Sequence, residues 1–343
     1  MARGRWKADF TQERIELMMR LSRLGLATAF ALALAAPARA ADPDKLLPAD
    51  ADTVMYVNVK QLIESDIVKK YALEQLKQTL AGGDAKKLLE ELGLDPLKDI
   101  DKLWAGTSGK DASDMKGLIV VHGKFDPDKL FKAAEAATKK DGDKFSMVKD
   151  GNTTMFKFQP DQGNPIYGTV VDDTTVIAGT DKKMIATALK QAEDKKKAPI
   201  GADLTALVKK MDEKSSIFVV SVVKGKFDAV KLPAQLPIDL SGLEKALPKT
   251  DSMSIVIKVG ADISLEVILG MKDDDAASDM GDAMAKIIDG IKGLVPLLAA
   301  AEPKAKPLVD VIKTVKSDVK KKDVTITGKM TGENLGKMIN PGD

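Results

Sequence analysis

The chain has 343 residues, of which 44% are apolar and 30% are charged, so it is long enough for one large or two ordinary domains with hydrophobic cores. Every arginine lies at or before Arg39, and the remainder has no arginine, no cysteine and a single histidine, His122. This composition argues against zinc, haem, copper and iron–sulfur sites, against thiol chemistry and against nucleic-acid binding. We therefore expect no cofactor and no nucleic-acid partner.

The first 40 residues have the pattern of an export signal. A positively charged stretch around Met18 precedes an apolar run at 24–36, which is too short to span a bilayer. Small residues at Ala38 and Ala40 lie three and one positions before a predicted cut after Ala40. We expect an exported protein, periplasmic or extracellular, with no transmembrane anchor after cleavage; an uncleaved anchor is the alternative. The start of translation is left open between Met1, Met18 and Met19.

Residues 41–197 are predicted to form a first α+β module. Short β-rich runs alternate with amphipathic stretches, and Asp150-Gly151-Asn152 is typical of a hairpin turn. The predicted elements are, in chain order, a strand at 53–59, a helix at 67–80, a short helix at 84–93, a helical turn at 95–96, strands at 101–107 and 117–122, a helix at 125–140, hairpins at 145–158 and 166–178, and a helix at 182–192.

Residues 198–343 are predicted to form a second α+β module. Its clearest element is a hairpin in which apolar residues alternate at 253–259 and 263–269, so one face should be buried and the other mostly wet. The other predicted elements are a helix at 204–211, a strand at 215–223, a helix after 273–275, a helix at 308–315, a strand at 323–328 and a helix at 333–339.

The two halves share short stretches of sequence. Val120–Asp126 partly matches Val222–Asp228, and Thr174–Gly179 resembles Asp323–Gly328. The two matches have different offsets, and the order of elements favours the second. Chance similarity and homology both stay open. The fold class expected is α+β, with two related modules, each an antiparallel sheet with helices packed mainly on one face.

Two further motifs accompany the export signal, Leu-Pro-Ala-Asp-Ala-Asp at 47–52 and Leu-Asp-Pro-Leu-Lys-Asp-Ile at 94–100. With them the chain resembles a recurring type of uncharacterised exported bacterial protein that is common in planctomycetes. The resemblance covers most of the mature chain. It implies duplicated antiparallel α+β modules of unknown function, and it carries over no catalytic residue.

Few residues are candidates for chemistry. His122 is the only imidazole base, but it ends an apolar strand and no Gly-x-Ser-x-Gly elbow accompanies it. Ser-x-x-Lys occurs at several positions, among them Ser113, Ser221 and Ser317, without the companion motifs of penicillin-recognising enzymes. We therefore assign no catalytic residue.

Asp273, Asp274 and Asp275 are the candidate calcium ligands. They precede a predicted helix, where aspartates are expected to cap the helix and to complement its dipole, so capping is the favoured interpretation and no metal is assigned. The helix that follows carries an apolar stripe beginning at Met280, which predicts either ordinary core packing or the lining of an apolar cavity.

These patterns favour an exported, non-enzymatic binding or scaffolding protein of the cell envelope, whose partner is an unknown envelope protein or an apolar ligand. One alternative is a carrier of an apolar ligand. The other is a metal-independent hydrolase that uses His122 or a pair of acids.

Overall fold

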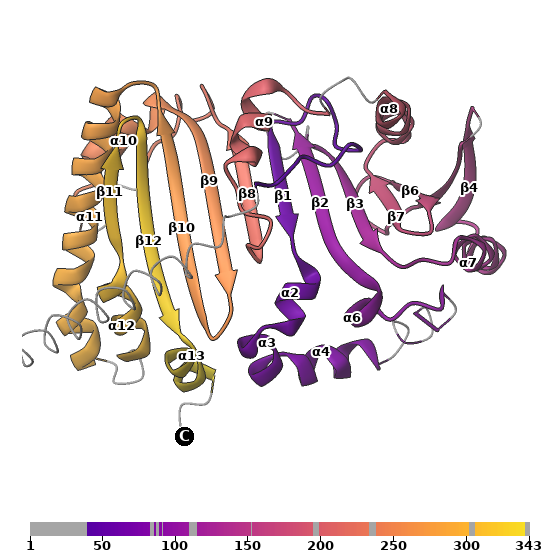
Figure 1. Cartoon of the computed structure of the whole chain (residues 1–343), viewed down its shortest axis with the longest axis horizontal. Helices are drawn as coiled ribbons and strands as arrows, with labels where there is room; N and C mark the ends of the chain where they lie inside the picture. Colours follow the sequence, from indigo (N-terminus) through magenta and orange to yellow (C-terminus); the bar gives the residue numbers. More distant parts are fainter. Residues whose placement is uncertain are drawn as a thin grey trace, which may run out of the picture. The chain divides into compact units, whose positions relative to one another are not determined.

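A single antiparallel sheet of twelve strands organises the protein in a computed structural model (Figure 1). The structure describes residues 40–82, 86, 89–90, 92–109, 115–151, 153–194, 199–232, 238–301 and 306–339. The strands lie in the order β11-β12-β10-β9-β8-β1-β2-β3-β7-β6-β5-β4. The predicted α+β class is therefore confirmed, and the predicted signal sequence lies outside the described residues.

The strands are β1 (Thr53–Val57), β2 (Ile100–Ser108), β3 (Lys116–Gly123), β4 (Phe145–Asp150), β5 (Thr153–Phe158), β6 (Ile166–Asp172), β7 (Thr175–Gly179), β8 (Ile217–Val222), β9 (Thr250–Val259), β10 (Asp262–Met271), β11 (Lys316–Lys320) and β12 (Asp323–Thr331). The helices are α2 (Val59–Glu64), α3 (Asp66–Tyr71), α4 (Leu73–Leu80), α6 (Pro96–Asp99), α7 (Pro127–Lys140), α8 (Lys182–Glu193), α9 (Ala202–Lys209), α10 (Ser241–Ala246), the 3₁₀ turn η1 (Leu247–Lys249), α11 (Asp274–Ala301), α12 (Lys306–Thr314) and α13 (Gly332–Ile339).

The prediction of one continuous helix at 67–80 is wrong, because α3 ends at Tyr71 and α4 begins at Leu73, and the backbone of Ala72 between them (φ −125°, ψ −26°) leaves the helical range. A further short helix, α2, precedes them. Side-chain caps start new helices there: Asn58 Oδ1 accepts the amide of Gln61 at 3.0 Å, and Ser65 Oγ accepts the amide of Val68 at 3.3 Å. The backbone of Ser65 is extended, which ends α2 before α3 begins. Half of the helix predicted at 84–93 lies outside the described residues, and residues 86, 89–90 and 92 are helical.

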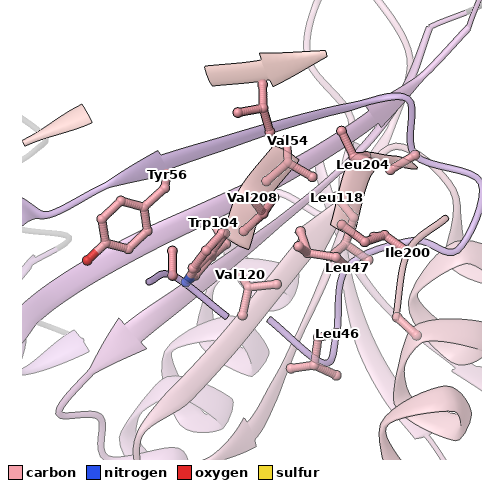
Figure 2. Packing of buried hydrophobic residues seen from close by; sticks show 14 of the residues in the cluster. Leu46, Leu47, Val54, Tyr56, Trp104, Leu118, Val120, Ile200, Leu204 and Val208 are labelled. Carbon is pink, nitrogen blue, oxygen red and sulfur yellow. The ribbon is translucent and has the colours of Figure 1, made fainter. Parts of the chain in front are cut away.

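One side of the sheet carries the main core, and we call it the closed face. Its side chains come from alternate positions of the central strands and are at most 7% exposed (Figure 2). Tyr56, Trp104 and Phe218 stack there, with the Tyr56 ring 4.7 Å from Trp104 and 4.9 Å from Phe218 between centroids. Helices α8 and α9 pack on this side, because Ile185 and Leu204 belong to the same cluster. The other buried residues of the central strands on this face are Val54, Leu118, Val120, Val220 and Val256.

Residues 41–51 lie on the closed face, and we call them the strap. The amide of Ala41 donates to the carbonyl of Met211 at 2.9 Å, and Leu46 and Leu47 are buried in the core (Figure 2). Pro48 lies so close to Gly106 that a Cβ atom there would come within 2.6 Å of the proline ring. The strap therefore completes the core, and β2 needs a glycine beneath it.

Helices cover the opposite side of the sheet at its two ends (Figure 1). At one end, Met280 of α11 is fully buried against Leu269 and Val324, which point away from the closed face. At the other end, Phe131 of α7 packs edge to face on Phe156 of β5, with 5.1 Å between ring centroids. The strands between these two groups of helices are β3, β2, β1, β8 and β9.

The predicted modules 41–197 and 198–343 share this sheet, because β1 pairs with β8 in an unbroken register from Thr53↔Ser221 to Val57↔Ile217. Residues from Ala40 onward form one compact unit. Homology between the halves stays a prediction. Among the described helices, none has the length and apolar character needed to cross a bilayer.

Candidate ligand-binding face

The central strands carry apolar side chains on both sides of the sheet, and in β1 and β3 those on the closed face are the more deeply buried. On the other side Met55, Ile119 and Leu265 are 39%, 47% and 42% exposed, whereas their neighbours Val54 and Val120 on the closed face are 0% exposed. We call this surface the open face. It consists of Met55, Val57, Leu103, Ala105, Ile119, Val121, Ile217, Val219, Ile255, Ile257 and Leu265.

The open face is built by cross-strand register. Antiparallel partners point to the same side, so the chain of pairs from Ile119 through Ala105, Met55 and Val219 to Ile255 forms one apolar row across five strands. A second row runs parallel to it, two residues further along each strand, from Val121 to Leu265. No member of either row is charged, in a chain of which 30% is charged.

The open face is about 29 Å wide over six strands and about 14 Å deep over two rows, which is on the order of 400 Å². Exposed apolar patches of this size on a monomer are often functional. A standard protein–protein interface buries about 800 Å² on each partner, roughly twice this area. The face is therefore too small for a standard dimer and suits a small apolar molecule.

A polar group of residues borders the open face where β1 begins, and we call it the rim cluster: Asp52, Thr53, Ser221 and Lys226. Thr53 and Ser221 lie opposite each other, with 2.7 Å between their hydroxyl oxygens. Lys226 Nζ donates to Asp52 Oδ2 at 2.6 Å, and Thr53 Oγ1 donates to Asp52 Oδ1 at 3.0 Å. The hydroxyl pair points to the open side, because Thr53 and Ser221 lie two residues from Met55 and Val219.

The sequence prediction for the hairpin of β9 and β10 is partly wrong. The face that carries Ile255, Ile257 and Leu265 was expected to be buried, but Leu265 is 42% exposed and Val256 on the opposite face is only 7% exposed. The physical reason is that α11 covers only the far ends of these strands, near Leu269, while the closed-face core reaches β9 from the other side.

His122 lies in a hydrogen-bonded group beside the strap. Its Nε2 is 2.5 Å from Asp44 Oδ2, and its Nδ1 is 3.4 Å from the Thr175 hydroxyl. The side chains of His122 and Asp44 are 22% and 12% exposed. None of the four hollows described in this structure, of about 320 to 610 Å³, has His122 in its lining. The His122–Asp44 pair therefore joins the strap to β3. None of these four hollows offers a substrate cavity beside the pair.

Asp273, Asp274 and Asp275 lie at the start of α11. Asp273 Oδ1 accepts the amide of Ala276 at 2.8 Å and so caps the helix, and Asp274 and Asp275 are exposed in its first turn. Within the described ranges, no group of three or more acidic, histidine or cysteine side chains is arranged to hold a metal ion. Met280, the start of the apolar stripe on α11, is packed in the core.

The hollows are lined by mixed charges. The largest, of about 610 Å³, lies between the ends of β9, β10 and the β11–β12 hairpin and is lined by Lys210, Lys320, Lys321 and Lys322 together with Asp251, Asp274 and Asp323. Lysine and carboxylate side chains alternate around it, so it has neither the apolar lining of a lipid cavity nor a single sign of charge.

The open face and the rim cluster were missed at the sequence level. The available signal was the unbroken apolar run of several central strands, such as Ile217–Val220, because strands with no polar alternation are typical of sheets covered on both faces. The rim cluster could not be predicted from a local sequence pattern, because Thr53 and Ser221 are 168 positions apart.

No family model and no curated protein matches the chain. Among solved structures, the chain is similar to TP0453, a Treponema protein, in two crystal forms. Form III has a TM-score of 0.46 at 9% identity, covering 87% of this chain and 98% of that chain, and form I has 0.44 at 9% identity, covering 88% and 97%. The similarity concerns the path of the chain only.

Proposed function

We propose that this is an exported, non-enzymatic binding protein of the cell envelope that holds the acyl chain of a single-chain lipid on its open face. The observation that carries the proposal is an uncharged apolar surface in the centre of the sheet, with Met55, Ile119 and Leu265 exposed, on the side opposite the main core. The export pattern of the first 40 residues supports the compartment.

The composition of the open face favours an acyl chain over a protein partner. Protein interfaces are enriched in tyrosine, tryptophan and arginine, whereas all eleven side chains of the open face are aliphatic or methionine. A methylene group contributes about 0.8 kcal/mol when fully buried and about half of that on a flat surface, so the roughly ten methylenes of a lauroyl chain give about 4 kcal/mol. This corresponds to a Kd on the order of 10⁻³ M before any contribution from a polar head.

The test uses the purified mature protein and an uncharged fluorescent probe, N-phenyl-1-naphthylamine, displaced by monolaurin. The wild type is expected to bind the probe and to release it to monolaurin. Met55→Lys, which places an ammonium group in the middle of the first row, is expected to lower the affinity at least tenfold. Val171→Lys is the matched control, because Val171 is a strand residue that is 38% exposed and lies outside the open face.

Two results would overturn the proposal. One is a wild type that binds neither the probe nor monolaurin. The other is a concentration-dependent dimer in sedimentation that Met55→Lys dissociates and Val171→Lys does not, since the open face would then be a protein interface and the scaffolding role would take its place.

A further inference from the structure

We infer that the rim cluster receives the head of the bound lipid, and that this head is uncharged and carries hydroxyl groups. This inference rests on the proposed function, because it names the class of ligand for the same face.

The rim cluster is placed where the head of an extended lipid would lie. Its Thr53–Ser221 hydroxyl pair is the next cross-strand pair after Met55–Val219, on the same side of the sheet. An acyl chain on the apolar rows therefore reaches polar groups at the β1 start without leaving the surface.

The hydrogen bonds of the rim cluster hold it in one arrangement. Ser221 is 5% exposed, and its hydroxyl contacts Thr53 Oγ1 at 2.7 Å and the carbonyl oxygen of Asp52 at 3.3 Å. The more accessible members are Asp52 and Lys226, with side chains 30% and 37% exposed. A ligand head would therefore meet a fixed carboxylate, a fixed ammonium group and a threonine hydroxyl.

The charge of the rim cluster selects against an ionised head. Asp52 and Lys226 neutralise each other at 2.6 Å, so the cluster has no net charge while it offers both donors and acceptors. A lipid carboxylate or phosphate at this position would find the Lys226 charge already paired with Asp52, and it would lie beside the Asp52 carboxylate, whose like charge repels it. A glycerol hydroxyl can donate to Asp52 and accept from Lys226 without breaking their pair.

The experiment compares monolaurin with laurate, which share the acyl chain and differ in the head, by titration calorimetry at pH 8. Wild-type protein is expected to bind monolaurin about fivefold more tightly than laurate, the scale of a partly exposed charge interaction. Asp52→Asn removes the repelling charge and keeps an acceptor for Thr53. It is expected to raise the affinity for laurate about fivefold and to change that for monolaurin less than twofold.

Asp101→Asn is the matched control. It removes the same charge from an exposed position at the other end of β2, and should leave both affinities unchanged. Equal wild-type affinities for the two lipids, or an identical effect of Asp101→Asn and Asp52→Asn, would overturn the assignment of the head while leaving acyl-chain binding intact. Failure of both lipids to bind would instead overturn the proposed function.

Discussion

The two faces of the sheet can be compared directly by shortening neighbouring side chains of β3. Val120 is 0% exposed and Ile119 is 47% exposed, and the two residues point to opposite sides. Val120→Ala removes two buried carbon atoms and leaves a cavity, so it should lower the free energy of unfolding by about 2 to 3 kcal/mol. Ile119→Ala removes three carbon atoms that are only about half buried, so it should cost about 1 kcal/mol.

The measurement is urea unfolding of the lipid-free protein, followed by circular dichroism. The larger deletion is expected to have the smaller effect, with the midpoint shifted less for Ile119→Ala than for Val120→Ala. A cost for Ile119→Ala equal to or above that for Val120→Ala would refute the reasoning, because it would mean that the open face is covered in solution by another part of the protein.

Two further predictions concern the strap and the core. His122→Ala should lower the free energy of unfolding by about 1 to 3 kcal/mol, because Asp44 Oδ2 loses its partner while Oδ1 keeps only the amide of Leu46. Limited proteolysis should then cut within the strap sooner than in wild type, and an unchanged digestion pattern would contradict this role. Burial, with a smaller contribution from Glu213, raises the pKa of Tyr56 to about 12. The unfolded chain loses this proton near pH 10, so the stability is full below pH 10 and falls as the pH rises to 12, by about 2 to 3 kcal/mol. Tyr56→Phe should remove that part of the alkaline loss, as measured by urea unfolding at pH 9 and pH 11.5, and an equal loss in both proteins would contradict it.

Local patterns in the sequence predicted most strands and helices, because alternation and capping act over a few residues. The hairpin of β9 and β10 and the cap of α11 at Asp273 are examples. Local patterns did not predict β11, whose Lys-Ser-Asp-Val-Lys sequence is mostly charged, as suits an exposed edge strand.

The open face needed long-range information. The alternation of apolar and polar residues indicates that a strand has two faces. Which face is covered depends on segments distant in the sequence, such as the strap, whose Ala41 amide donates to the carbonyl of Met211. The pairing of Asp44 with His122 is of the same kind, since nothing near His122 in the sequence indicates its partner. These are tertiary contacts, and they cannot be predicted from the periodicity of a single sequence.

The central place of β1 in the sheet determines when folding can be completed during synthesis. β1 is the first strand to emerge, yet one of its neighbours, β8, follows far later, since Thr53 and Ser221 are 168 positions apart. Until β8 arrives, one edge of β1 has no hydrogen-bonding partner and the strap has no carbonyl at Met211 to accept from Ala41. The sheet can therefore be completed at β1 only after about two thirds of the chain has been synthesised, and until then the free edge of β1 is exposed to aggregation.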